Sequence, residues 1–205
     1  MIKIAVLVSG GGTNLQALID AEKKGVIKSG TLSLVVANKS DAYALERAKN
    51  AGIKGCVVLK KDYENQVAFE DAIIRKLREN GIGFIVLAGF MSILSKHFTD
   101  AFSGRIINVH PALIPSFCGE GYYGLKVHEA ALRKGVKVTG ATVHYVNEIA
   151  DGGEIILQKA VAVRKNDTPE TLQKRVMKQA EWIILPRATE IVCKKLSKIN
   201  GGKEE

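Results

Sequence analysis

The sequence lacks the marks of several large protein classes. It has three widely spaced cysteines, Cys56, Cys118 and Cys193, and no CxxC pair. This spacing argues against a zinc site and a disulfide framework, and it indicates a reducing compartment, the cytoplasm. No apolar run reaches the ~18 residues that a membrane span needs. Glycine breaks the apolar N-terminus too early for a signal peptide.

The composition is that of an ordinary globular chain. Hydrophobic residues make up 46% of the 205 residues and charged residues 25%, so a core of normal size needs no disulfide or metal to hold it. The net charge of +9 suits acidic partners, either nucleic acid or anionic small molecules. The lysines are spread along the chain without a dense basic stripe, so we expect no nucleic-acid partner.

The first half of the chain alternates between apolar strands and amphipathic helices. Continuous apolar runs indicate strands that are buried on both faces, as in parallel sheets. We expect strands at 2–8, 32–38, 55–59, 84–90 and 105–110, and helices at 14–24, 42–51 and 69–80. This alternation predicts a doubly wound α/β fold with a mostly parallel open sheet.

In the second half of the chain, the regular alternation of strands and helices stops. Residues 111–124 are rich in proline and glycine and form a predicted loop, followed by a helix at 125–134. Strands at 138–146 and 154–163, joined by a short turn, predict an antiparallel pair. A helix begins at Thr168-Pro169 and runs towards Lys198, with an irregularity before Pro186. We expect one domain over 1–199, with halves at 1–110 and 111–199, and a frayed tail at 200–205.

Two glycine-rich segments differ in context. Residues 9–14, Ser-Gly-Gly-Gly-Thr-Asn, lie between a buried strand and a helix, where free N–H groups and the helix dipole suit a phosphate better than a plain turn would require. The segment is neither a P-loop, since no lysine follows, nor a dinucleotide fingerprint, since Leu15 replaces the third glycine. Residues 119–124 match GxGxxG but follow a loop, which predicts a flexible loop or lid.

The candidate chemical groups lie at the end of the fifth strand. Asn108 and His110 are two residues apart and therefore share one face, at the edge of the sheet where ligands bind. Asp151 lies in an Asp-Gly-Gly segment that also suits a simple turn. Spacing alone does not bring Asp151 to His110, but a nearby carboxylate would raise the pKa of the histidine.

The other histidines carry weaker expectations. We expect a solvated His97 on a helix, His128 on a helix near the glycine-rich loop, and His144 on a strand that could face the same cleft. Their spacing matches no metal-ligand pattern, so we expect no metal site.

Five segments resemble the glycinamide ribonucleotide formyltransferases, folate-dependent enzymes of purine synthesis. The segments follow one another in order, and the resemblance runs from residue 1 to about residue 192. They are VSGGGTNLQALID (8–20), VLAGFMSILS (86–95), INVHPALIPSF (107–117), GATVHYVNEIADGGEIILQ (140–158) and QAEWIILP (179–186).

The resemblance implies transfer of a formyl group from 10-formyltetrahydrofolate to the primary amine of glycinamide ribonucleotide, giving formylglycinamide ribonucleotide and tetrahydrofolate. It implies no metal, no membrane, and a monomer or homodimer. The implied catalytic residues are Asn108, His110 and Asp151. The implied ribonucleotide-binding residues are Gly12, Thr13, Asn14, Pro111, Lys178 and Glu181. The implied folate-binding residues are Phe90, Met91, Ser92, Ile93, Leu94, Asn108, Asn147, Glu148, Ile149, Ala150 and Asp151.

The chemistry of formyl transfer suits these roles. Attack of the amine produces a tetrahedral oxyanion, to which Asn108 and a protonated His110 could donate. His110 is also the natural proton shuttle, kept charged by Asp151. Two features depart from the family: the loop at 118–124 is longer than in some members, and Gln66 stands where some carry an arginine that contacts folate.

Alternative functions remain at this point. A methionyl-tRNA formyltransferase or a formyltetrahydrofolate deformylase shares the Asn-x-His core but carries a further domain, for which we expect no room in 205 residues. A non-catalytic nucleotide-binding module would bind phosphate at residues 10–14 without depending on His110.

Overall fold

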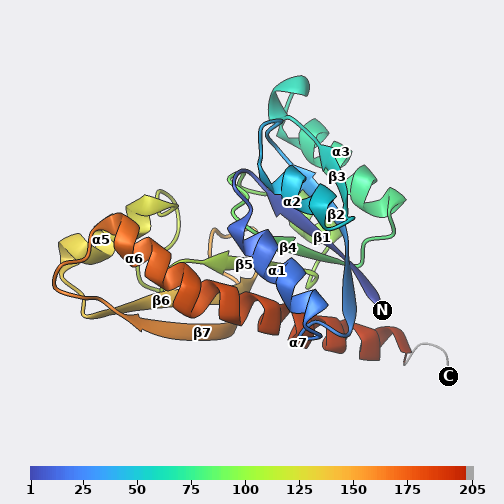
Figure 1. The fold of residues 1–205 in the computed structure, drawn as a ribbon. Coiled ribbons are helices and arrows are strands. Elements are labelled where there is room, and N and C mark those ends of the chain that lie inside the picture. The colour runs from blue at the N-terminus through green and yellow to red at the C-terminus, as the bar shows by residue number, and fades with distance from the viewer. Residues whose placement is uncertain (202–205) are drawn as a thin grey trace.

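The computed structural model describes residues 1–201, which form one seven-stranded sheet with helices on both faces (Figure 1). The strand order is β3-β2-β1-β4-β5-β6-β7. Strands β1 to β5 are parallel, whereas β6 pairs antiparallel with both β5 and β7. The predicted fold class is therefore confirmed, including the antiparallel pair in the second half.

The bounds of the elements follow the predicted pattern closely. The strands are β1 (Ile2–Val8), β2 (Gly30–Ala37), β3 (Lys54–Val57), β4 (Phe84–Leu87), β5 (Ile106–His110), β6 (Val138–Tyr145) and β7 (Ile155–Ala162). The α-helices are α1 (Thr13–Lys23), α2 (Ala44–Asn50), α3 (Gln66–Glu79), α4 (Lys96–Ala101), α5 (Leu125–Lys134), α6 (Pro169–Val176) and α7 (Trp182–Gly201). A 3-10 turn, η1 (Lys60–Asp62), and a π-helical turn, η2 (Met177–Glu181), complete the list.

The sheet separates two apolar cores. Ile4, Val6 and Val8 of β1 face a core that α1, α2, α6 and α7 cover. Ala5 and Leu7 face the opposite core, which α3 and α4 cover. Because β1 is buried on both faces, its sequence shows a continuous apolar run instead of alternation. In Figure 1, α1 and α7 run beside each other over the first core, and the two helices are in contact.

Strand β4 ends earlier than predicted. The apolar run to residue 90 suggested a longer strand, but the strand stops at Leu87 and Gly89 adopts a φ of 73°. The chain after β4 is instead tied to the loop after β1: Ser9 N donates to Gly89 O (3.1 Å), and Met91 N donates to Ser9 Oγ (2.8 Å). Two loops at the carboxyl edge of the sheet are thereby joined.

The C-terminal helical region is irregular, as predicted. Thr168 caps α6 through a hydrogen bond from Thr171 N, and Pro169 occupies the first helical position. The π-helical turn η2 separates α6 from α7, and Pro186 lies inside α7. Helix α7 continues to Gly201, so the rest of the predicted frayed tail at 200–205 lies outside the described residues. In the part that is described, no helix is both long and apolar enough to cross a bilayer.

Candidate functional site

A cleft of about 770 Å³ opens at the carboxyl edge of β4 and β5. Its walls are the segment after β4, the end of β5, the loop at 119–124 and the turn after β6. It brings together the predicted catalytic residues, Pro111 and the whole predicted folate-binding set. The lining includes Phe90, Met91, Ser92, Ile93, Leu94, Asn108, His110, Pro111, Asn147, Glu148, Ile149, Ala150 and Asp151.

Asp151 lies between two histidines at the base of the cleft. Its Oδ2 is 3.4 Å from His110 Nδ1, and its Oδ1 is 3.4 Å from His144 Nε2. The amide nitrogen of Asn108 is 3.3 Å from the same His144 Nε2. Sequence spacing left Asp151 unplaced, and the structure joins it to the Asn108–His110 pair. His144 also lines the cleft, as the sequence led us to expect.

The backbone determines which nitrogen of His110 can exchange a proton. His110 Nε2 is 2.8 Å from the carbonyl oxygen of Phe117. A carbonyl only accepts hydrogen bonds, so Nε2 carries the hydrogen and Nδ1 is the basic nitrogen in the neutral ring. His110 therefore presents its titrating atom to Asp151. His144 is oriented in the same way: its Nδ1 donates to Tyr145 O (2.8 Å), which leaves Nε2 to accept from Asn108.

Burial reverses the expected direction of the pKa shift of His110. The side chain is 5% exposed. Its desolvation lowers the pKa of His110 and outweighs the opposing effects of Asp151 and the Phe117 carbonyl. The pKa of Asp151 is raised by its own burial, but its contacts with His144 and Gly119 more than compensate and hold the net pKa below its usual range. Asp151 thus raises the pKa of His110, as expected of a nearby carboxylate, but burial has the larger effect and gives the net shift the opposite direction.

The other two histidines, His97 and His128, lie on helices, as predicted. His128 is fully buried on α5, where burial and the nearby His110 lower its pKa to about 4, so it stays neutral. His97 is 47% exposed on α4 and lies 2.7 Å from Asp71. Within residues 1–201, no group of three or more histidine, cysteine or acidic side chains is arranged to hold a metal ion.

Loop 117–119 holds two of the predicted catalytic side chains, His110 and Asp151, through its backbone. The Phe117 carbonyl binds His110, and Gly119 N donates to Asp151 Oδ2 (2.9 Å). Phe117 and Asp151 have φ values of 52° and 55°, a conformation that non-glycine residues rarely adopt. Such backbone strain is concentrated at functional sites. Sequence analysis missed Phe117 and Gly119 because backbone contacts leave no signal in residue type.

The turn that carries Asp151 requires its glycine. A Cβ on Gly153 would lie 1.8 Å from the carbonyl oxygen of Tyr145. The backbone of the turn therefore packs directly on the end of β6. A hydrogen bond from Tyr145 N to Glu154 O (2.8 Å) closes the turn. The Asp-Gly-Gly segment is a turn, as its composition predicts, and the same turn delivers the carboxylate to the cleft.

The glycine loop after β1 forms an open helix N-terminus. Gly12 caps α1 with a φ of 70°, and no side chain occupies the cap. A Cβ on Gly12 would lie 2.7 Å from Ala44 Cβ, whereas one on Gly10 or Gly11 would meet nothing within 4 Å. Free N–H groups at the positive end of a helix dipole suit an anion, so phosphate binding by residues 9–14, called the anion loop from here on, stays a prediction.

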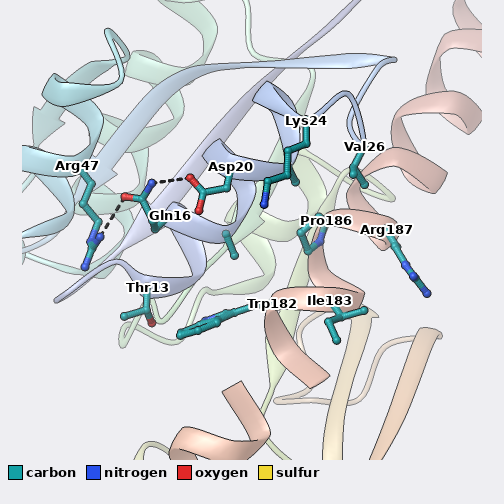
Figure 2. Close-up of a pocket in the computed structure, with 12 residues that line it drawn as sticks. Thr13, Gln16, Asp20, Lys24, Val26, Arg47, Trp182, Ile183, Pro186 and Arg187 are labelled. Carbon is teal, nitrogen blue, oxygen red and sulfur yellow. Dashed lines mark hydrogen bonds between the residues drawn. The ribbon is translucent and has the colours of Figure 1, made fainter. Parts of the chain in front are cut away.

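Arg47 braces this loop from α2. Its Nε donates to Gly11 O (2.8 Å), its Nη1 donates to Gln16 Oε1 (3.0 Å), and its guanidinium lies over the Tyr43 ring. Figure 2 shows the hydrogen bond between Arg47 and Gln16, which lies at one end of a second groove of about 450 Å³ between α1 and α7. Sequence analysis missed Arg47 because it lies 36 residues from its carbonyl partner.

Glu181 joins the anion loop to the π-helical turn η2. Asn14 Nδ2 donates to Glu181 Oε2 (2.7 Å), and burial raises the pKa of Glu181 to about 7. Gly12, Thr13, Asn14 and Glu181 therefore lie in one region, and their binding of a ribonucleotide stays a prediction. Lys178 is exposed on η2 and lines neither groove.

The buried carboxyl of Glu181 makes stability depend on pH. A carboxyl whose pKa is raised in the folded state does not lower the free energy of unfolding at a pH below its unfolded-state pKa. Its destabilising effect grows as the pH rises to about 7, the pKa of Glu181 in the folded state. We expect Glu181→Gln to increase the free energy of unfolding by up to about 3 kcal/mol at pH 8 and by little at pH 5. Urea unfolding at both pH values measures the difference. Glu79→Gln, at an exposed site, is the control, and an equal gain at both pH values contradicts the prediction.

The anion loop offers a matched pair of glycines. Gly12→Ala should lower the free energy of unfolding by roughly 1–3 kcal/mol, since alanine disfavours its φ and the Cβ contacts Ala44. Gly10→Ala has room for its Cβ and should change stability little. Urea midpoints of the two variants test this contrast, and equal losses would refute it.

The formyl transferase family matches residues 2–189. A phosphoribosylglycinamide formyltransferase from Haemophilus influenzae is 44% identical over 186 residues, covering 91% of this chain and 84% of that protein. The human trifunctional purine biosynthetic protein adenosine-3 is 46% identical over 93% of this chain, which spans 18% of that protein's length.

A solved structure agrees in fold. The glycinamide ribonucleotide transformylase 1 from Symbiobacterium toebii superposes with a TM-score of 0.89 at 40% identity, covering 95% of this chain and 89% of that one. The family match covers most of the chain, and it includes the cleft and the anion loop. The chain belongs to the formyl transferase family.

Proposed function

We propose that this protein transfers the formyl group of 10-formyltetrahydrofolate to the primary amine of glycinamide ribonucleotide, a step of purine synthesis. The observation that carries the proposal is the cluster of Asn108, His110 and Asp151 in the cleft of a formyl transferase. A relative of similar length bears the name phosphoribosylglycinamide formyltransferase. A deformylase or tRNA-directed activity has no comparable support.

The ribonucleotide binds along the anion loop. Its phosphate accepts hydrogen bonds from the N–H groups of Gly12, Thr13 and Asn14, where the dipole of α1 favours negative charge. Glu181 accepts from the sugar or amine side, held in place by Asn14. Pro111 lines the cleft, and Lys178 is an exposed cation three residues before Glu181. The amine thereby reaches His110 from the side of the anion loop.

His110 acts first as a base. Its pKa is lowered by burial, so the ring is neutral and Nδ1 is free to accept a proton at neutral pH. As the amine attacks the formyl carbon, Nδ1 takes up the departing proton and the imidazolium is stabilised by Asp151, 3.4 Å away. The same nitrogen then returns the proton to the leaving nitrogen of the donor, directly or through water.

Asn108 stabilises the oxyanion. Because His144 Nε2 accepts one hydrogen of the Asn108 amide, the second N–H is directed to the cleft. A donor that is already oriented towards the developing negative charge contributes more than one that must reorganise, and loss of one such donor costs about 10²–10³ in rate. His144 is therefore a positioning residue for Asn108.

The donor occupies the opposite wall of the cleft. Phe90 to Leu94 and Asn147 to Ala150 flank its ring system, and Asp151 lies at its reactive end. In this arrangement residues 1–199 work as one domain, with residues 1–110 holding the ribonucleotide and residues 111–199 completing the folate site. We infer that the protein works in the cytoplasm, as a monomer or homodimer, without a metal or nucleic acid.

Replacing His110 tests the catalytic assignment. His110→Ala should lower kcat by about 10²–10⁴, since general acid–base catalysis contributes that much. The matched control is His97→Ala, which removes an exposed histidine on α4. Absorbance of the folate product reports turnover with both substrates present. Full turnover by His110→Ala would sink the assignment, and ribonucleotide binding without turnover by the native protein would indicate a non-catalytic module.

The pH profile tests the His110–Asp151 pair. The rate constant kcat/KM should rise with pH through an apparent pKa below the ordinary value of about 6.5, because neutral His110 is the active form. Asp151→Asn removes the carboxylate that raises this pKa, so the acid limb should move to lower pH while the rate falls roughly 10²-fold. Asparagine tolerates the positive φ at this position. An unmoved limb would argue against the pairing.

A further inference from the structure

The outer wall of the cleft is apolar and exposed. Met91, Ile93 and Ile149 are 52%, 67% and 62% exposed, and all three line the cleft. Tyr122 and Tyr123 line it from the loop before α5. Large apolar side chains that gather in one exposed place indicate a binding surface. This apolar wall, defined here by Met91, Ile93, Ile149, Tyr122 and Tyr123, lies outside the catalytic cluster.

The charge of the cleft is opposite to that of the protein. The chain has 30 lysines and arginines against 21 acidic residues. Among the described residues that line the cleft, none is a lysine or an arginine. The lining instead carries the carboxyl groups of Glu120, Glu148 and Asp151, the first two at exposed positions.

Two lysines that lie beside the cleft, Lys96 and Lys126, already have side-chain partners. Lys126 Nζ donates to Tyr123 Oη (2.9 Å) and lies over the Tyr123 ring. Lys96 Nζ binds both carboxylate oxygens of Asp100, at 2.7 and 2.8 Å. Gln66 reaches the carbonyl oxygen of Ile93 (3.2 Å), but its amide is neutral and also bonds to Glu70. Among the described residues, the lining of the cleft thus offers an anionic ligand no cation of its own, and the nearest lysines must first leave their partners.

The donor that the proposed function requires has two unlike parts beyond its pterin. An aryl ring follows the formyl-bearing nitrogen, and a glutamate follows the ring; further glutamates can extend this tail through γ-linkages. The ring suits the apolar wall. Each added glutamate brings another negative charge towards Glu120 and Glu148, where like charges repel.

We propose that the apolar wall holds the aryl part of the formyl donor while the carboxylates of the tail stay unpaired, so that the enzyme does not select donors with a poly-γ-glutamyl tail. The inference rests on the proposed function and extends it to the choice between donors. Affinity for the donor then comes from apolar contact, which salt affects little, and not from ion pairs, which salt screens.

Donor kinetics test this inference. The intact protein is assayed with saturating glycinamide ribonucleotide and with 10-formyltetrahydrofolate that carries one or five glutamates, at about 20 mM and about 200 mM salt. We expect the KM of the pentaglutamyl donor to be no more than about threefold below that of the monoglutamyl donor at either salt concentration. A larger advantage for the pentaglutamyl donor at either salt concentration overturns the inference.

Variants separate the two parts of the argument. Ile93→Ser should raise the KM of both donors alike, by about tenfold, since it removes apolar contact with the shared ring. Gln66→Arg should lower the KM of the pentaglutamyl donor more than that of the monoglutamyl donor, because it adds a cation beside Ile93 and the longer tail carries more carboxylates. Glu120→Gln should also favour the pentaglutamyl donor, whereas Glu79→Gln, the same charge change at the far end of α3, should not. Equal effects of Gln66→Arg on both donors, or none, contradict the inference.

Failure of the inference is distinct from failure of the proposed function. If neither donor supports formyl transfer to glycinamide ribonucleotide, the proposed function is wrong and the inference falls with it. If both donors support transfer and the pentaglutamyl donor is preferred by more than about threefold, the function stands and only the inference is overturned.

Discussion

The antiparallel pairing of β6 with β5 is the constraint on which the proposed catalytic cluster depends. Its register places His144 opposite Asn108 and Thr142 opposite His110. A shift of one residue would turn every side chain of β6 to the other face of the sheet. The pairing of β6 with β7 has a register shift between Val143 and His144, next to the residue that faces Asn108. Strand pairing therefore determines which side chains of β5 and β6 face one another in the cluster.

Thr142 extends this pairing to the loop after β5. Its Oγ1 donates to Ala112 O (2.7 Å) and accepts from Ile114 N (3.1 Å), so a buried hydroxyl holds the start of the loop against β6. The loop then reaches Phe117, whose carbonyl orients His110. On the other side, Ser9 joins the segment after β1 to the segment after β4. The two proposed substrate regions are thus connected at one edge of the sheet through hydrogen bonds between side-chain hydroxyls and the backbone.

The sequence predicts the parts of this site that depend on local periodicity. The shared face of Asn108 and His110, the glycine loop before α1 and the antiparallel pair in the second half all follow from spacing and residue type. Asp151 could not be placed this way, because 41 residues and two changes of direction separate it from His110. Arg47, Phe117 and Gly119 were missed for a related reason, since each acts through a contact with or from the backbone. The sign of the pKa shift of His110 depends on burial, which the chain order does not reveal.

The orientation of His110 by a backbone carbonyl has a consequence for how such a site can change over evolutionary time. Every residue offers a carbonyl and, proline apart, an N–H, so the identity of the side chains at 118–123 is not constrained by the proton chemistry. This loop also lines the mouth of the cleft. Drift in its length and side chains can therefore alter which molecules enter, while the acid–base properties of the buried histidine are inherited intact.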